Sequence, residues 1–425
     1  MDAARPKKRP SAASLKKVTP ENLARLGAER LAEILAGVAQ ARPELKRRLR
    51  MELAAEQGAD HLMVEIDRRL AALETSRSRV SWRQRSTFVR DLKGLRELIA
   101  VRLAELDGPA ARDRLFQFLQ LAPRLRTRVR DADGQVAETF AQGARDLSRL
   151  AEAADVGFLA GTLAQQVALA PGDWAQWLPL AVDGRPELAE ATLRRLSDHP
   201  AFAASWLPSL RTLADAAGNV DAYRATFTPA ELAGQAVAAE VGARLLAAGR
   251  VEEAGEVLEA AAASTPIRAP GRRAAEPLFA WESAWIEYLE RSGQSAAAQA
   301  ALWASFERTL SVDRARAFIA RLGGFDDVEA EARAFALAAG HPDFEAGLRF
   351  LLDWPALPEA AGMILARRAE AEVAAELAEL WAGRLRTRFP EAAELLLRKA
   401  AAAAFRRRDL ATCDRLTAEA DSIGL

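Results

Sequence analysis

The sequence predicts an all-α protein, and three observations lead to this prediction. Apolar residues recur at helical spacing over most of the 425 residues. Strong helix formers such as Ala, Leu, Arg and Glu dominate the composition, whereas Tyr occurs only twice. Alternating apolar and polar segments bounded by hairpin turns are missing from the sequence. We therefore expect a right-handed α-α superhelix, a tetratricopeptide-like solenoid of irregular helical hairpins, behind an N-terminal helical region.

The chain begins with a basic stretch and then becomes helical. Residues 1–18 carry six Lys or Arg side chains and one acid, which predicts a disordered basic tail. Thr19 is expected to cap the first helix, with Pro20 at its first position and Glu21 near the positive end of the helix dipole. The residues that recur next at helical spacing are Leu23, Leu26, Leu31, Ile34, Leu35 and Val38.

An N-terminal helical domain is expected over residues 19–155. Apolar residues mark three more helices, the last of which runs from Trp82 to about Leu106 beyond a polar loop at 75–81. The first two are marked by Leu45, Leu49 and Leu53 and by Leu62, Ile66, Leu70 and Leu73. The buried stripe expected on the last consists of Phe88, Leu92, Leu95 and Ile99. The segment Asp131–Gly134 lacks the ligand spacing of a calcium loop, so we expect an Asx turn that caps the next helix.

Residues 156–425 are expected to form the solenoid. Between residues 156 and 230, frequent Pro and Gly predict short helices of about 10–18 residues with short connections. Gly249 and Gly293 lie 44 residues apart, and each stands where a helix-turn-helix pair needs a left-handed C-cap. A third pair of similar shape begins at Phe389.

A short echo also indicates internal repetition. We expect each of its prolines to occupy the first position of a helix and each of its phenylalanines to face inward. The two histidine rings are expected to meet free backbone groups rather than to act as catalytic bases. The two segments are His199-Pro200-Ala201-Phe202 and His341-Pro342-Asp343-Phe344.

Sequence signatures of catalysis are missing. There is no Gly-Lys-Ser/Thr phosphate loop, no Gly-x-Ser-x-Gly nucleophile elbow and no His-Glu-x-x-His zinc helix. The single Cys413 stands 72 positions from His341, its nearest histidine in the sequence. We therefore expect a protein that is not an enzyme and has no cofactor and no metal site. The lone cysteine, the lack of a secretory signal and the lack of a long apolar run predict a cytoplasmic protein without a membrane partner.

The charges are balanced in total and unbalanced along the chain. The whole sequence holds 59 basic and 59 acidic residues. Residues 1–155 hold 31 basic and 22 acidic residues, a net charge of +9, and residues 156–425 hold 28 and 37, a net charge of −9. This division predicts an N-terminal face for anionic partners, or for docking against the acidic C-terminal array. The preference for Arg over Lys, 52 against 7, is typical of GC-rich bacterial coding.

The best binding candidate is a basic segment with an aromatic residue inside it. Arginine forks suit phosphate groups, and an aromatic ring can stack on bases. The alternatives are a solvated helix face for the basic residues and a core position for the aromatic ring, because a regular helix spreads these residues over more than one side. The candidates are Arg77, Arg79, Trp82, Arg83, Arg85, Arg90, Lys93 and Arg96. A second arginine set at period two comprises Arg124, Arg126, Arg128 and Arg130.

Several stretches resemble an uncharacterised bacterial all-helical family, a domain of unknown function. The resemblance covers residues from about 19 to 420 and implies a tetratricopeptide-like superhelix. Some relatives carry a SWIM-type zinc segment, and this sequence lacks the cysteines for it, so no metal site carries over. The stretches are Thr19–Leu31, Leu45–Leu53, Ser76–Arg83, Leu302–Leu310, Phe325–Glu331, His341–Phe344, Phe350–Leu357 and Ala392–Arg398.

The expected function is that of a protein-protein interaction scaffold. Helical hairpins without a catalytic constellation favour binding of a protein or peptide on a solenoid surface. The alternative is a nucleic-acid-associated protein that uses the basic tail and the segment from Arg77 to Arg96, with binding that weakens steeply as salt rises. The sequence predicts no particular partner, pathway or oligomeric state.

Overall fold

The computed structural model describes residues 18–151, 156–263 and 278–423 and divides the chain into two compact units. Unit 1 is residues 1–226 and unit 2 is residues 227–425. The all-α prediction is confirmed, because over the described ranges the structure contains helices and no strand, apart from one isolated bridge between Val80 and Val129. The predicted boundary between residues 155 and 156 lies inside unit 1. Except for its last residue, the predicted tail at residues 1–18 lies outside the described residues.

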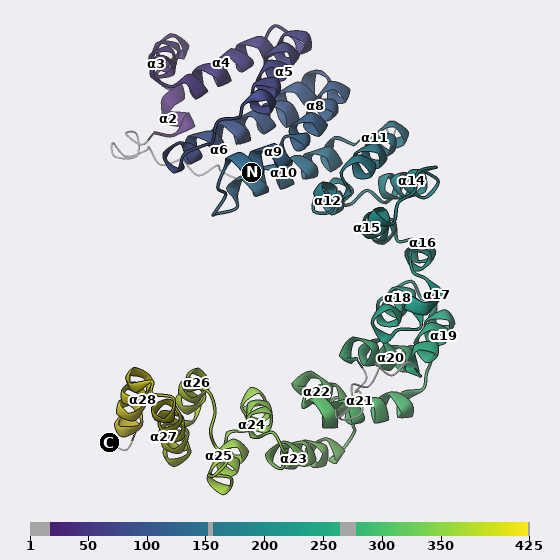
Figure 1. Ribbon diagram of the computed structural model, residues 1–425, viewed down its shortest axis with the longest axis vertical. Helices are drawn as coiled ribbons and strands as arrows, with labels where there is room; N and C mark the ends of the chain where they lie inside the picture. Colours follow the sequence, from purple (N-terminus) through teal and green to yellow (C-terminus); the bar gives the residue numbers. More distant parts are fainter. Residues whose placement is uncertain (1–17, 152–155, 264–277, 424–425) are drawn as a thin grey trace, which may run out of the picture. The chain divides into compact units, whose positions relative to one another are not determined.

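The helices of unit 1 follow one another with short connections (Figure 1). They are α2 (Pro20–Ala24), α3 (Ala28–Ala41), α4 (Pro43–Ala55), α5 (Ala59–Thr75), α6 (Trp82–Glu97), the π-helix η1 (Leu98–Leu103), α7 (Ala104–Leu106), α8 (Gly108–Gln120), α9 (Ala122–Arg128), α10 (Gln135–Leu150), α11 (Val156–Leu169), α12 (Pro171–Trp174), α13 (Leu178–Ala181), α14 (Pro186–Ser197), the 3-10 helix η3 (Ala204–Trp206), α15 (Leu207–Ala217) and α16 (Val220–Ala225).

Unit 2 contains helices of similar length in the described part of residues 227–425. They are α17 (Pro229–Leu232), α18 (Gln235–Ala247), α19 (Val251–Ala262), α20 (Phe279–Arg291), α21 (Ser295–Thr309), α22 (Val312–Ile319), α23 (Asp326–Ala339), α24 (Phe344–Asp353), α25 (Leu357–Ala366), α26 (Ala375–Leu385), α27 (Pro390–Arg406) and α28 (Leu410–Ile423).

The start of unit 1 is as predicted, but its first apolar stripe is not buried. Thr19 caps α2 by accepting a hydrogen bond from the backbone N–H of Asn22, and Pro20 is the first helical residue. Gly27, with a φ of 76°, then separates α2 from α3. The apolar residues that recur here at helical spacing lie mostly at the surface: Leu31 is half-buried, and Leu23, Leu26, Ile34, Leu35 and Val38 are exposed. The buried residue of α3 is Ala39, near the end where the chain turns into α4.

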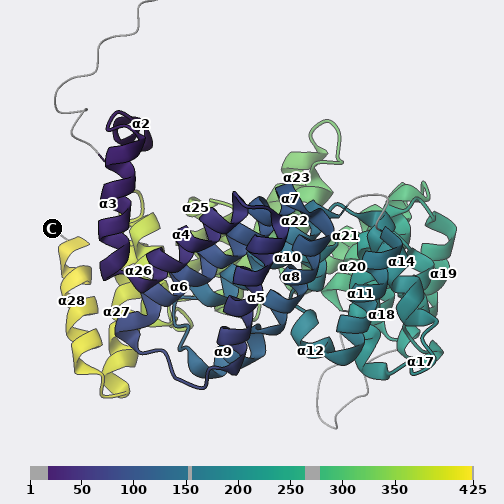
Figure 2. The same cartoon turned by 90° about the horizontal axis from the view of Figure 1, so that it is seen from above.

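The core of unit 1 forms where α5, α6, η1, α8 and α10 pack together. All four apolar residues that mark α5 in the sequence, Leu62, Ile66, Leu70 and Leu73, are buried. The long helix expected from Trp82 to Leu106 is confirmed, with a π-helical segment in its last third. The helix α4 contacts both α5 and α6, as the two views of the ribbon show (Figures 1 and 2). These three helices carry the site described below.

Two predictions for residues 156–230 need correction. The helices α12, α13 and α16 are shorter than expected, because the chain bends between α12 and α13 so that Trp174 and Trp177 both enter the core. Neither proline of the His-Pro echo starts a helix. Pro200 lies ahead of η3, and Pro342 precedes the N-cap of α24.

The His-Pro echo is nevertheless a shared local structure. His199 Nδ1 accepts a hydrogen bond from the backbone N–H of Ala201 at 3.1 Å. His341 Nδ1 accepts one from the backbone N–H of Asp343 at 3.2 Å. The expectation that both rings meet free backbone groups is therefore confirmed. Of the two phenylalanines expected inside, Phe344 is buried and Phe202 is exposed.

The helical hairpins expected in unit 2 are confirmed one by one. Gly249 separates α18 from α19 with a φ of 75°, and Gly293 separates α20 from α21 with a φ of 79°. Both backbone conformations are left-handed, which explains the glycines. The pair α27 and α28 packs along its length in the same antiparallel manner (Figure 1). Their arrangement as a right-handed superhelix stays a prediction.

Candidate functional site

The loop between α5 and α6 is held in place by arginines of α9. Arg128 donates hydrogen bonds to the carbonyl oxygens of Leu73 and Ser78 and to the hydroxyl of Ser76, at 2.8–3.0 Å. Arg124 donates to the carbonyl oxygen of Glu74 at 2.9 Å. These donors meet the free carbonyl groups at the C-terminus of α5, where positive charge is favoured. The loop that carries Arg77 and Arg79, and the start of α6, are thereby fixed against the unit.

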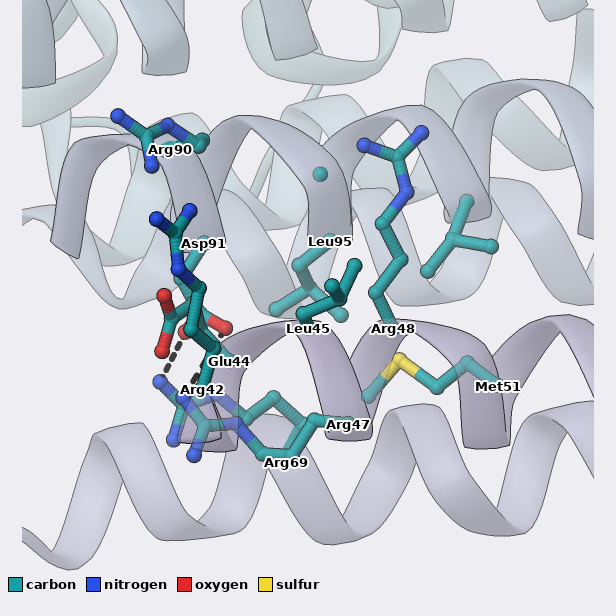
Figure 3. Close-up of a pocket in the computed structure, with 12 residues that line it drawn as sticks. Arg42, Glu44, Leu45, Arg47, Arg48, Met51, Arg69, Arg90, Asp91 and Leu95 are labelled. Carbon is teal, nitrogen blue, oxygen red and sulfur yellow. Dashed lines mark hydrogen bonds and ion pairs between the residues drawn. The ribbon is translucent and has the colours of Figure 1, made fainter. Parts of the chain in front are cut away.

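A small pocket lies between α4 and α6, near the C-terminal part of α5. Its volume is about 130 Å³. Gly94 leaves space on the α6 side, because a Cβ placed there would have a single neighbour within 4 Å, the Nη1 atom of Arg48 at 3.9 Å. Apolar side chains form the floor of the pocket, and in Figure 3 Leu45 and Leu95 lie between Arg48 and a group of charged residues. The apolar side chains are Leu45, Met51, Leu95 and Leu98.

The charged end of the pocket is built around one carboxylate. Asp91 of α6 accepts a hydrogen bond from Arg47 of α4 at 3.2 Å and another from Arg69 of α5. One carboxylate therefore ties three helices together and faces two guanidinium groups. The Nε atoms of Arg47 and Arg69 are buried and have no acceptor among the described residues. Positive charge exceeds negative charge at this point even after the ion pairs are made.

The side chains of two further arginines that line the pocket have no partner among the described residues. Arg42, just before α4, and Arg90 on α6 line the pocket, and their side chains form no ion pair or hydrogen bond with any residue that the structure describes. Arg48 is less free, because its guanidinium lies 4.0 Å from a carboxylate oxygen of Glu52 and 3.8 Å from one of Glu97. With Glu44 and Asp91 as the acids, the lining residues hold five arginines against two carboxylates. The pocket thus combines an apolar floor with a cationic rim.

A second, more open hollow adjoins this pocket and shares Arg47, Arg69 and Asp91 with it. Its volume is about 420 Å³, and Arg79 and Arg83 line it. The indole of Trp82 stands beside the hollow and is 80% exposed, so the core position considered for this residue is wrong. The guanidinium carbon of Arg83 lies 5.2 Å from the centre of the indole ring. Hydroxyl and amide side chains, Ser76, Ser78, Gln84 and Thr87, complete the lining.

The structure separates the predicted binding residues into two groups. Arg90 lines the pocket, Arg79 and Arg83 line the adjoining hollow, and Arg77 lines a third hollow together with Arg124 and Arg128. Lys93 is exposed on α6.

Two of the predicted residues hold the fold together instead. Arg85 donates to Asp133 at 2.9 Å and to the carbonyl oxygen of Arg130. Arg96 pairs with the buried carboxylate of Asp146 on α10. Burial lowers the pKa of the Arg96 guanidinium, and the nearby carboxylate of Glu97 opposes this shift.

Sequence reasoning missed the basic residues that α4 and α5 contribute. The segment that ends α3 and begins α4 holds the arginines Arg42, Arg47 and Arg48, but it was interpreted through its leucines alone. The sequence did contain a signal for the basic residues of α4. Arginines that share a helix with an apolar stripe predict a surface that is both charged and apolar. Arg69 carried no such signal, since its position beside Asp91 depends on the packing of α5 against its neighbours.

The acidic segment near residue 131 has a structural role. Asp131 accepts hydrogen bonds from the backbone N–H groups of Val136 and Ala137, at 3.1 and 2.9 Å. Gly134, with a φ of 69°, allows the chain to turn there. Asp131 therefore caps α10 as expected. Its carboxylate bonds to residues five and six positions along the chain rather than two, so the expected Asx turn is not formed.

Comparison with known proteins identifies one family. The sequence profile of a family of unknown function (DUF6880) matches residues 13–198 and 201–409, which is most of the chain. No curated protein and no solved structure matches the chain. Within the described residues, no helix has the length and apolar character that crossing a membrane requires.

Proposed function

The chain belongs to this family of unknown function, and from that premise we propose that it is a non-enzymatic binding protein that engages a protein or peptide partner on unit 1. The observation that carries the proposal is the pocket between α4 and α6, where an apolar floor meets unpaired arginines. Protein segments present apolar and anionic groups side by side. A surface that offers complements to both is therefore suited to a protein partner.

The lining of the pocket favours binding over chemistry. Its residues are Arg, Glu, Asp, Leu, Met and Gly, and none of the twelve is a histidine, cysteine, serine or lysine. General acid–base and nucleophilic catalysis rely mainly on such side chains. The two carboxylates, Glu44 and Asp91, share the lining with five arginines, and Asp91 accepts hydrogen bonds from Arg47 and Arg69. This composition supports a recognition role for the pocket.

Charge reversal at the pocket tests the proposal. The full-length chain would be isolated from its native cells after nuclease treatment, as wild type and as the Arg42→Glu/Arg90→Glu variant. Since neither arginine has an ion pair in the described structure, the variant should keep the wild-type circular dichroism melting curve. The recovery of a stoichiometric protein partner should fall at least tenfold, because two attractive charges become repulsive.

A matched control keeps the result specific. Lys46 and Arg50 are exposed on α4 and lie outside the pocket lining. The Lys46→Glu/Arg50→Glu variant changes the net charge by the same amount and should recover the partner as well as the wild type does. Equal recovery with both variants, or no stoichiometric protein with any of the three proteins, contradicts the proposal.

Nucleic-acid binding is a second candidate function, and the exposed ring of Trp82 favours it. Arg83 lies beside this ring, and Arg79 and Arg83 both line the adjoining hollow, a combination that suits one stacked base and its phosphates. Trp82→Ala should then weaken binding of a single-stranded oligonucleotide by about 1–3 kcal/mol. Titrations at several salt concentrations give the number of phosphates contacted. An oligonucleotide affinity unchanged by Trp82→Ala and by Arg79→Ala/Arg83→Ala excludes this site.

A further inference from the structure

The pocket between α4 and α6 has a size and a charge pattern that specify its ligand further. We propose that it receives one large apolar side chain, such as Phe or Leu, from a peptide segment whose neighbouring residues are carboxylates. This inference rests on the proposed function and names the partner chemistry for that same site.

The volume of the pocket matches a single side chain. An engineered apolar cavity of about 150 Å³ accommodates benzene. The pocket measures about 130 Å³, which is close to that size. A Phe ring or a Leu side chain would therefore fill it, whereas the floor leaves no room for a second residue.

The floor selects against nucleic-acid bases. Leu45, Met51 and Leu95 offer no hydrogen-bond donor or acceptor of useful strength to a buried ligand, and Gly94 presents only its backbone. A base buried there would lose the water that its polar edge needs, at an unfavourable free energy. A hydrocarbon side chain loses nothing of this kind and gains from burial.

The rim selects carboxylates next to the apolar side chain. Arg42 and Arg90 are unpaired with any described residue, and each guanidinium can hold a carboxylate through two parallel hydrogen bonds. In Figure 3, Arg90 and Arg42 both belong to the charged end of the pocket, next to Leu45 and Leu95. The excess of positive charge on this rim therefore favours anionic residues on both sides of the apolar side chain.

Gly94 provides a way to test the apolar part without altering any charge. Its missing side chain keeps the α6 wall open, and a Cβ there meets no atom closer than 3.9 Å. A leucine at this position would occupy the space that the ligand needs. Gly94→Ala fills less of the pocket and suits a helix interior better than glycine does.

The experiment measures peptide binding to the full chain by fluorescence anisotropy. The probe is a labelled 12-residue peptide with a central Phe and two Asp residues on each side. Its Phe→Ala form should bind about 10- to 100-fold more weakly, as expected for the loss of one buried aromatic side chain. The form with Asn in place of Asp should lose affinity and also most of its dependence on salt.

Variants of the protein then assign the binding to this pocket. Gly94→Leu should bind the Phe and Ala peptides equally, and Gly94→Ala should show an intermediate preference for Phe. Arg42→Glu/Arg90→Glu should no longer distinguish Asp from Asn peptides. Lys46→Glu/Arg50→Glu should behave as the wild type, and the melting curve of each variant shows whether it is folded.

Several results overturn the inference. If Gly94→Leu and Gly94→Ala are folded and keep the wild-type preference for Phe, the apolar side chain does not enter this pocket. An unlabelled oligonucleotide that competes better for the wild type than for Gly94→Leu assigns the pocket to nucleic acid instead. If cellular partner recovery depends on Arg42 and Arg90 while no acidic Phe peptide binds, only the inference fails. If partner recovery also ignores these arginines, the proposed function fails with it.

Discussion

The ion pair of Arg96 and Asp146 should be necessary for the stability of unit 1. The Asp146 side chain is 1% exposed and that of Arg96 is 14% exposed, so the pair links α6 to α10 inside the protein. Replacing Arg96 with Met removes the charge and keeps most of the apolar stem. Asp146 would then remain with Arg149, whose side chain is 65% exposed, and with the Gln142 amide at 3.5 Å.

The magnitude follows from what remains around Asp146. Removing one member of a buried ion pair costs about 3–5 kcal/mol. Arg149 still neutralises the carboxylate from the solvent side. The loss of stability caused by Arg96→Met should therefore lie at the lower end of this range, at about 3 kcal/mol. Because about 1.4 kcal/mol corresponds to a factor of ten, the opening equilibrium of α6 and α10 should rise by about 100-fold. Arg96→Met/Asp146→Leu removes both charges and should recover most of the loss.

Hydrogen exchange of the α10 amides is the suitable assay, since two units need not unfold in one transition. Arg90→Met is the matched control, because Arg90 is on the same helix but exposed and unpaired within the described structure. It should change the opening free energy by less than about 0.5 kcal/mol. Equal exchange rates of α10 in Arg96→Met and Arg90→Met would refute the division between structural and binding arginines.

Three further predictions concern other parts of the chain. Gly347→Ala should destabilise unit 2 by more than about 1 kcal/mol in urea unfolding, since its Cβ would lie 2.2 Å from the carbonyl oxygen of Ala338; an unchanged midpoint contradicts this. Hydrogen bonds from the side chain and the backbone N–H of Thr412 lower the pKa of Asp409 in the folded protein from its ordinary value of 3.8. The stability that Asp409 contributes is therefore complete above pH 3.8 and is lost as the pH falls through the lower pKa of the folded state. Asp409→Asn should therefore reduce the acid sensitivity of unfolding measured between pH 6 and pH 2, and an identical pH profile argues against it. Arg128→Ala should speed trypsin cleavage in the loop after α5, which that side chain holds; wild-type cleavage rates would show that the loop needs no such support.

The helices and the turns of unit 2 were predictable because their causes are local. A left-handed residue such as Gly249 ends one helix and begins the next whatever lies nearby. The stripe on α5 was predictable for a related reason: a helix with one apolar face buries that face when helices cover it from several sides. The ring nitrogens of His199 and His341 bond to residues two positions along the chain, so they too needed no distant partner.

The errors occur where a distant neighbour decides the outcome. The apolar residues of α3 recur at helical spacing, as those of α5 do, but α3 packs mainly on α4 in the described structure and leaves most of them exposed. The bend between α12 and α13 depends on the rings of Trp174 and Trp177, which meet edge to face at 5.8 Å. Spacing along one helix shows which face is apolar, but it does not show whether another helix lies against that face.

The candidate site was predictable in part for the same reason. Arg90 and Arg96 lie six residues apart on one helix and have the same intrinsic chemistry. Only the position of α10, which brings Asp146 from 50 residues away, makes one of them structural. The rim of the pocket also contains residues of α4 and α5, and neither helix is part of the basic segment from Arg77 to Arg96.

Whether a charged side chain has a partner therefore predicts binding better than the net charge does. Residues 18–151 hold 25 basic and 19 acidic residues, a surplus that alone predicts a diffuse attraction for anions. Arg96 and Arg114 each have a carboxylate partner from another helix, and an incoming anion would have to displace that partner before gaining anything. Arg42 and Arg90 require no such exchange with a described residue. At physiological salt a diffuse field is screened within about 8 Å, so recognition depends on unpaired cations at contact distance. The pocket between α4 and α6 combines two such cations with an apolar floor.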